Sequence, residues 1–153
     1  MYKVSWNEFE SLSIELAKNI LDSGKKFTAI VGVSRGGLLL ARLLSSILKL
    51  PMGVIDAKYV QNKYVIDEHV STIFELKGDI LLVDDVLEII SKEIILKIKK
   101  NYKHVTSVSS ASIFYKTNNN FKPDFYVNNV KDMLTIIFPY QEISINENFE
   151  NSL

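Results

Sequence analysis

The tetrapeptide SRGG at residues 34–37 combines residue types that bind anionic groups. It lies between FTAIVGV, a β-branched run that predicts a strand, and LLLARLLSSILKL, an apolar run that predicts a helix. Glycines let backbone N–H groups approach an anion, a helix N-terminus adds partial positive charge, and arginine can grip a pyrophosphate with two hydrogen bonds. A tight turn with a solvated arginine explains the tetrapeptide equally well. The candidate residues are Ser34, Arg35, Gly36 and Gly37.

Two adjacent carboxylates, Asp84 and Asp85, follow the apolar run ILLV, which predicts a buried strand. Carboxylates at a strand end can accept hydrogen bonds from sugar hydroxyls or hold Mg²⁺, which prefers oxygen ligands. Side chains alternate along a strand, so the two need not share a role. At a strand tip, each is expected to face solvent or a ligand. The dipeptide taken alone favours the competing interpretation, an acidic strand end without a ligand.

A third polar cluster, Tyr115-Lys116, also follows a predicted strand. Lys116 could donate to a carbonyl on a ligand, although a solvated loop lysine is the simpler interpretation of this residue alone. His69 and His104 lack partners at metal-ligand spacing and are interpreted as non-catalytic. Four aromatic residues near the C-terminus are interpreted as core rather than as a base-stacking group, although one of them could serve both roles: Phe125, Tyr126, Phe138 and Tyr140.

Alternating helices and strands must position these clusters. Helices are predicted at residues 6–21, 38–50 and 91–101, the first with Ser5 as N-cap and Glu8 completing a capping box. Strands are predicted at residues 27–33, 52–60, 79–86 and 105–115, with short β segments at 124–130 and 134–140. Residues 61–77 show no clear period. Fully apolar strands alternating with helices indicate an α/β fold with a mostly parallel sheet, flanked by helices, whose ligands bind beyond the carboxyl ends of the strands.

Composition excludes several classes of function. The 153 residues suffice for one domain, predicted over residues 1–153. The 18 basic and 18 acidic residues balance, so neither nucleic acid nor a membrane surface is an expected partner. The absence of cysteine excludes disulfides, thiolate metal sites and cysteine catalysis. No apolar run approaches a membrane span and the N-terminus has no signal-peptide pattern, so the expected location is the cytoplasm.

Taken together, the sequence resembles the type I phosphoribosyltransferases, and within them the small purine (xanthine–guanine–hypoxanthine) branch. IVGVSRGGLLLARLLS is similar to the pyrophosphate loop and following helix of that family, and LKGDILLVDDV to its phosphoribosyl pyrophosphate (PRPP) strand. VSWNEF resembles the N-terminus of the purine branch, and KPDFYV and IIFPY resemble its small C-terminal hood over the base. The resemblance covers nearly the whole chain.

The resemblance implies that a purine base displaces pyrophosphate from PRPP, with Mg²⁺ on the leaving group, to give a nucleoside monophosphate. By the same resemblance, residues 34–37 would bind pyrophosphate, with Lys58 as a further candidate. Asp84 and Asp85 would hold the ribose hydroxyls and Mg²⁺, and Lys116 would contact the 6-oxo group of the purine. Residues 59–74 correspond to a mobile lid, and the family often forms homo-oligomers, which are expected here too.

The sequence departs from the family at substrate contacts. After the two aspartates the family has Asp-Thr-Gly and, after one variable residue, Thr or Ser. Here Glu88, Ile89 and Ile90 stand at the first three positions; Glu88 remains a candidate proton acceptor. Lys92 replaces the last, so only Ser91, Lys92 and the helix N-terminus could rebuild the 5′-phosphate cradle. The expected base-stacking aromatic is absent, since Thr135 precedes Ile136 in the predicted base site.

Three interpretations remain open. The leading one is a divergent phosphoribosyltransferase that acts on a nitrogenous base, most simply a 6-oxopurine. The second is a catalytically impaired relative that binds a nucleotide or another phosphorylated ligand as a sensor or regulator. The third is a different chemistry on the same fold, such as transfer to an amine that is not a purine.

Overall fold

A computed structural model describes residues 1–117, 120–131 and 133–142. Six strands form one sheet in the order β4-β3-β2-β5-β6-β7, parallel throughout except between β3 and β4. The helices are α1 (Trp6–Asp22), α2 (Gly37–Leu48) and α3 (Ile90–Asn101). The strands of the sheet are β2 (Ala29–Ser34), β3 (Met52–Val60), β4 (Lys63–Ile66), β5 (Gly78–Leu87), β6 (Val105–Lys116) and β7 (Phe125–Val130). The predicted α/β class with a mostly parallel sheet is confirmed.

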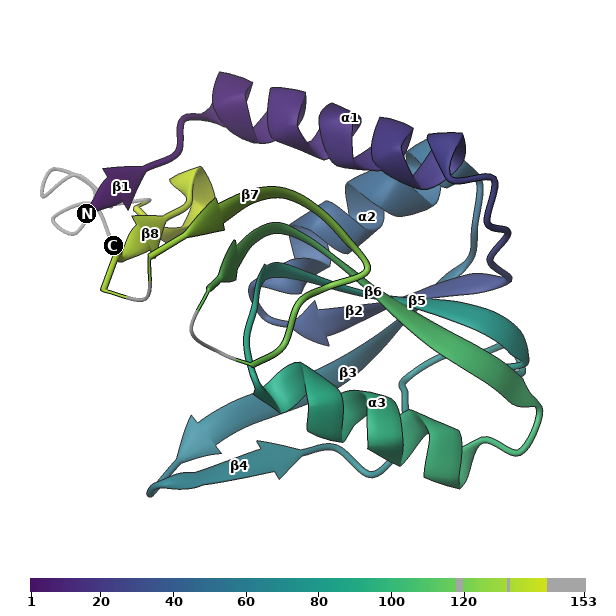
Figure 1. The fold of residues 1–153 in the computed structure, drawn as a ribbon. Coiled ribbons are helices and arrows are strands. Elements are labelled where there is room, and N and C mark those ends of the chain that lie inside the picture. Colours follow the sequence, from purple (N-terminus) through teal and green to yellow (C-terminus); the bar gives the residue numbers. More distant parts are fainter. Residues whose placement is uncertain (118–119, 132, 143–153) are drawn as a thin grey trace, which may run out of the picture.

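The helices cover both faces of the sheet, with α1 and α2 on one face and α3 on the other (Figure 1). Successive residues of a central strand alternate between two cores: Ile30 packs with α1 and α2, whereas its neighbour Val31 packs on the α3 side. Leu81 and Leu82 of β5 divide in the same way. The uninterrupted apolar runs in the sequence therefore reflect strands that are buried on both faces.

Ser5 caps α1 as predicted, because its Oγ accepts the backbone N–H of Glu8 at 3.2 Å. The carboxylate of Glu8 accepts the hydroxyl of Tyr2, which attaches the N-terminal strand to the helix. At the other end, the chain leaves α1 through Gly24, whose φ of +72° is a conformation that glycine adopts without strain.

The first part of residues 61–77, the stretch without a clear period in the sequence, forms a β-hairpin with β3. Strands β3 and β4 pair antiparallel around Gln61 and Asn62, whose φ angles are 48° and 60°. Positive φ at both residues is the two-residue turn that matches the twist of paired strands. Neither is glycine, and a four-residue β4 is too short to show a period. This hairpin forms part of the predicted lid at residues 59–74.

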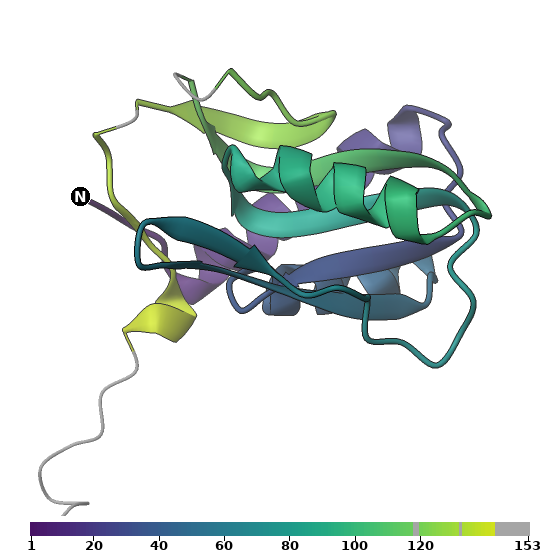
Figure 2. The ribbon, with the colours of Figure 1, turned by 90° about the horizontal axis from the view of Figure 1, so that it is seen from below.

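The hood contains both ends of the described chain. Strand β1 (Tyr2–Lys3) pairs in parallel with β8 (Ile136–Ile137), and the short 3₁₀ helix η1 (Pro139–Gln141) follows. Phe138 anchors this unit, since it is almost completely buried against Phe9 of α1. The hood and the β3–β4 hairpin both lie at the carboxyl end of the sheet, on the left in Figures 1 and 2. The predicted hood is thus present, with the N-terminus as part of it.

Candidate active site

Two cavities lie at the carboxyl end of the sheet. The larger, of about 840 Å³, is lined by Ser34, Arg35, Gly36, Ala57, Lys58, Tyr140 and Gln141. The smaller, of about 320 Å³, is lined by Asp85, Val86, Glu88, Lys116, Leu134, Thr135, Ile136, Phe138 and Gln141. Gln141 lines both, so the cavities adjoin at the hood. The structure therefore gathers most of the residues singled out in the sequence, from the ends of β2, β3, β5 and β6, around two neighbouring spaces.

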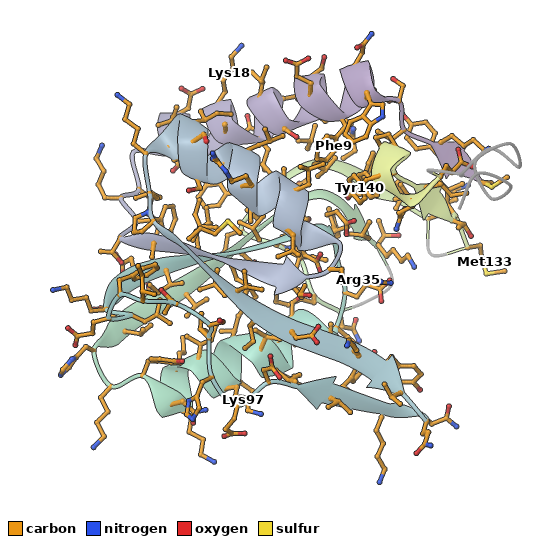
Figure 3. The ribbon with its side chains drawn as sticks, turned by 180° about the vertical axis from the view of Figure 1, so that it is seen from behind. Phe9, Lys18, Arg35, Lys97, Met133 and Tyr140 are labelled. Atoms are coloured by element: carbon orange, nitrogen blue, oxygen red, sulfur yellow. The ribbon has the colours of Figure 1, made fainter. Side chains whose placement is uncertain are left out.

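The SRGG loop occupies the turn between β2 and α2, with Arg35 exposed beside the larger cavity (Figure 3). The peptide bond between Ser34 and Arg35 is cis. Both glycines are required by packing on β5: a Cβ at Gly37 would lie 2.5 Å from the carbonyl oxygen of Val83, and one at Gly36 would lie 2.7 Å from each carboxylate oxygen of Asp85. The glycines therefore let the loop lie directly on the acidic strand, a role that the sequence did not reveal.

Gly37→Ala is expected to destabilise the fold by about 1–3 kcal/mol, the usual range for overpacking, because the atoms in its way belong to the β5 backbone. Urea denaturation measures this loss. Gly36→Ala is the matched control, since its new methyl group meets side-chain atoms of Asp85 rather than the β5 backbone, and a smaller loss is expected. Equal losses in the two variants would contradict this assignment.

Asp84 and Asp85 lie within β5 rather than at its tip, because the strand continues to Leu87 and Asp84 pairs with Ser112. Asp85 is only 8% exposed, and it lines the smaller cavity rather than facing open solvent. Its Oδ1 accepts the backbone N–H of Val86 at 2.7 Å, and its Oδ2 accepts the hydroxyl of Tyr140 at 2.7 Å. The carboxylate is therefore held from two sides.

The electrostatics of the pair follow from burial. Desolvation raises the pKa of Asp84 well above its ordinary value, and the negative charge of Asp85 adds to this shift. Burial also raises the pKa of Asp85, although the hydrogen bonds from Tyr140 and the Val86 amide oppose it. Within the described part of the chain, neither carboxylate forms an ion pair with a lysine or arginine. A bound cation would favour the charged form of both carboxylates.

The donor set fits Mg²⁺. This ion is usually bound by one or two carboxylates and completes its shell with water and substrate phosphates. Among residues 1–117, 120–131 and 133–142, no group of three or more His, Asp or Glu side chains could enclose a metal. The two aspartates therefore suit an ion that is shared with a phosphorylated substrate rather than a closed protein site.

In the smaller cavity, Glu88 and Lys116 form an ion pair with 2.9 Å between Oε1 and Nζ. The predicted proton acceptor and the predicted contact to the base thus lie side by side, although they are 28 residues apart in the sequence. Thr135 and Ile136 line the same cavity from the hood. In the larger cavity, Lys58 pairs with Asp56 at 3.1 Å. Glu88, Lys116, Thr135 and Ile136 thus share the smaller cavity, Lys58 lies in the larger one, and their roles stay predictions.

The segment after the aspartates differs from the expected cradle. Helix α3 begins at Ile90, and Ile89 stands at its N-cap without a side-chain hydrogen bond. The backbone N–H groups of Ser91 and Lys92 donate to the carbonyls of Glu88 and Ile89. These N–H groups would be needed by a bound phosphate, and here they are used within the chain.

The structure contradicts a phosphate contact through Ser91. Its side chain is completely buried, and its Oγ has no hydrogen-bond partner among the described residues. A hydroxyl without exposed surface cannot contact a ligand in this conformation. The ammonium group of Lys92 lies 5.9 Å from the ring centre of Phe121, the distance of a cation–π contact.

Sequence reasoning missed Tyr140 and Gln141. Tyr140 packs against the core together with Phe138, but its hydroxyl also reaches Asp85 and its side chain lines the larger cavity. A single sequence holds no periodic signal for an aromatic residue in a 3₁₀ turn. The two histidines lie outside the lining of both cavities: His104 contacts Glu75, and His69 packs on Tyr102.

Comparison with known proteins supports this picture. A family described as the phosphoribosyl transferase domain matches residues 5–143, whereas no curated protein matches the chain. The solved purine phosphoribosyltransferase of Pyrococcus horikoshii Ot3 superposes with a TM-score of 0.78 at 28% identity, covering 95% of this chain and 97% of its own. The xanthine-guanine-hypoxanthine phosphoribosyltransferase of Helicobacter pylori gives a TM-score of 0.74 at 24% identity, covering 99% and 97%.

A further structure of the same fold, a hypothetical protein from Neisseria gonorrhoeae with bound ppGpp, has a TM-score of 0.70 at 19% identity and covers 99% of this chain and 95% of its own. No helix in the described part of this chain is long and apolar enough to cross a membrane. The domain match spans nearly the whole sequence and agrees with the observed sheet order, helices and hood. The chain therefore belongs to the phosphoribosyl transferase domain family, and the resemblance to its type I purine branch is confirmed.

Proposed function

We propose that this protein transfers the phosphoribosyl group of PRPP to a nitrogenous base, a 6-oxopurine, and releases pyrophosphate. The observation that carries the proposal is the pair of adjoining cavities, one with groups suited to a pyrophosphate and the other with an ion pair suited to a base. Asp85 lines the smaller cavity and lies against Gly36 of the larger one, and Asp84 is its neighbour on β5, so the transferred sugar would bind between the two cavities.

At the pyrophosphate end, the exposed guanidinium of Arg35 and the ammonium of Lys58 supply positive charge. The N-terminus of α2 adds its partial positive charge from Gly37 onward. Asp84 and Asp85 would hold Mg²⁺ and the ribose hydroxyls, which would give their negative charge a partner. When bound, Mg²⁺ would supply charge neutralisation on the departing pyrophosphate.

At the base end, Lys116 would donate to an oxo group while Glu88 accepts a ring N–H, which matches a flat ring with both groups on one edge. As the ring nitrogen forms its bond to C1 of the ribose, the bond from C1 to the pyrophosphate oxygen breaks and the pyrophosphate leaves with the electron pair. The ring proton passes to Glu88. Such a reaction depends mainly on positioning and electrostatics, which the two fixed ends of the site supply.

The altered loop favours a second candidate function. Ile89 caps α3 without a hydrogen bond and the nearby backbone donors are used internally, so the 5′-phosphate would be held weakly. A relative that binds a nucleotide as a sensor would tolerate this loss better than an enzyme. The fold is compatible with such a ligand, since the Neisseria gonorrhoeae protein carries bound ppGpp.

One screen separates the two functions. The protein is incubated with PRPP, Mg²⁺ and individual bases, and pyrophosphate release is measured. Release with a 6-oxopurine supports the enzyme. Thermal stabilisation by nucleotides, with no pyrophosphate release in the presence of any base, supports the sensor.

Arg35→Ala is expected to weaken Mg²⁺-pyrophosphate binding about tenfold, since an exposed charge-assisted contact lies at the low end, about 1.5 kcal/mol, of the usual range. Calorimetric titration measures the change. Arg42→Ala is the matched control, because Arg42 lies on α2 and bonds Ser46, outside the lining of the larger cavity. Unchanged affinity in Arg35→Ala would reject the proposed pyrophosphate contact.

A further inference from the structure

Tyr140 connects three parts of the molecule that the sequence keeps apart. From η1 in the hood, its hydroxyl donates to Oδ2 of Asp85 on β5 at 2.7 Å. The carbonyl oxygen of Gly36, in the loop after β2, lies 3.3 Å from the same hydroxyl. One phenol therefore contacts both the acidic strand and the SRGG loop, across 55 and 104 residues of sequence.

The ring of Tyr140 is fixed by other aromatic rings. Phe138 stacks on it with 5.4 Å between ring centres and 8° between planes, and Phe9 meets it edge-on at 5.5 Å. Trp6 contacts it at 6.4 Å. Figure 3 shows Tyr140 beside Phe9, where the hood meets α1. Phe9 and Phe138 are almost completely buried, so these rings fix the position of the Tyr140 ring and of its hydroxyl.

The carboxylate that receives this hydroxyl has little freedom. Its Oδ1 is held by the Val86 amide, and the space beside Gly36 is too small for a methyl group. Tyr140 supplies the side-chain contact that sets the orientation of Oδ2 among the described residues. Asp85 lines the smaller cavity and Tyr140 the larger, so their hydrogen bond lies at the boundary between the two.

We propose that Tyr140 is a positioning residue that holds the Asp85 carboxylate for the ribose and metal of PRPP and thereby ties the hood to the pyrophosphate loop. This inference rests on the proposed function, because it takes PRPP as the ligand at the boundary between the cavities. It assigns the hood a part in binding the sugar-phosphate, in addition to its place over the base.

The test compares Tyr140→Phe with wild type by calorimetric titration of PRPP in the presence of Mg²⁺, at a temperature where both are folded. The variant keeps the ring and loses the hydroxyl, so PRPP affinity is expected to fall about tenfold, as for one hydrogen bond to a charged group. Where a base is turned over, KM for PRPP should rise about tenfold and kcat should change less.

Tyr102→Phe is the matched control. It also loses one tyrosine hydroxyl with a 2.7 Å hydrogen bond, here from the Val70 amide on the α3 side, and its PRPP affinity should equal that of wild type. If Tyr140→Phe does not fold, Trp6→Ala replaces it. Trp6 is 53% exposed and supports the Tyr140 ring, so its removal should weaken PRPP binding two- to threefold.

The outcomes are distinct. PRPP affinity in Tyr140→Phe equal to that of wild type, with only a lower melting temperature, would overturn the positioning role. Wild type that binds PRPP but transfers it to no base would overturn the proposed enzyme, while the affinities of the two proteins would still decide the role of Tyr140. Wild type that binds no PRPP would overturn both.

Discussion

Asp84→Asn combined with Asp85→Asn is expected to abolish Mg²⁺-dependent binding of PRPP, with affinity falling more than 100-fold. Each aspartate is proposed to hold the metal or a ribose hydroxyl, and each charge-assisted contact contributes about 1.5–3 kcal/mol. Two lost contacts exceed the roughly 2.8 kcal/mol that corresponds to 100-fold. Calorimetric titration of PRPP with and without Mg²⁺ measures the loss.

The same double variant is expected to unfold at a higher temperature than wild type when both are free of ligand. Burial and mutual repulsion disfavour the charged pair in the folded protein, and no lysine or arginine compensates them in the described part of the chain. Asparagine removes the charge and keeps the shape. If the double variant is less stable than wild type and binds PRPP with unchanged affinity, the two aspartates are structural and the proposed site is wrong.

Asp79→Asn supplies the matched control for both measurements. Asp79 lies near the start of β5, away from the two cavities, where its carboxylate accepts the hydroxyl of Ser107 at 2.6 Å. Its replacement removes a carboxylate from the same strand. PRPP affinity should therefore stay at the wild-type value, and the free protein should gain no stability.

The sheet and the location of the site were predictable from sequence for a physical reason. Strands buried on both faces, such as β2 and β5, require continuous apolar runs, and these were recognised in ILLV and FTAIVGV. A mostly parallel order then brings the ends of several strands to one edge. The clusters at Ser34, Asp84 and Lys116 meet there because of the topology, not because of their own sequence spacing.

The details of the site depend on contacts that no local pattern encodes. The strand carrying the aspartates continues to Leu87 because it pairs with β6 as far as Tyr115, and this buries Asp85. The hydroxyl that bonds Asp85 belongs to Tyr140 of the hood. Position 36 must be glycine because a side chain there would collide with the Asp85 carboxylate. The hairpin turn at Gln61 and Asn62 lacks glycine, the usual signal for positive φ.

The second large effect concerns the loop after the aspartates. Replacing it with the family pattern, by Glu88→Asp, Ile89→Thr, Ile90→Gly and Lys92→Thr, is expected to tighten the binding of PRPP and of a nucleoside monophosphate tenfold or more. Threonine at position 89 restores a hydroxyl donor. Glycine at position 90 frees the backbone whose N–H groups at Ser91 and Lys92 now donate to the carbonyls of Glu88 and Ile89. One recovered charge-assisted hydrogen bond of about 1.5 kcal/mol already gives tenfold.

This gain in affinity should be accompanied by a loss of stability. Ile90 packs against the core on the α3 side but is only partly buried, so its removal should cost about 2 kcal/mol, the low end for large-to-small substitutions. Ile89 is 44% exposed and stands at an N-cap without a hydrogen bond, and threonine there should return about 1 kcal/mol. Urea denaturation of the restored loop should therefore show a net loss of about 1 kcal/mol.

The control keeps the loop apolar: Ile89→Val with Ile90→Val changes side-chain volume without adding a donor or a flexible residue, and its affinity should equal that of wild type. All three proteins are titrated with PRPP and with a nucleoside monophosphate at one Mg²⁺ concentration. If wild type already binds tightly and the restored loop binds worse, the isoleucines contact a ligand of their own. Their exposed and partly buried surfaces at the start of α3 would then bind a ligand group other than a 5′-phosphate. The proposal of a 6-oxopurine enzyme should in that case be abandoned in favour of the sensor or of transfer to a different amine.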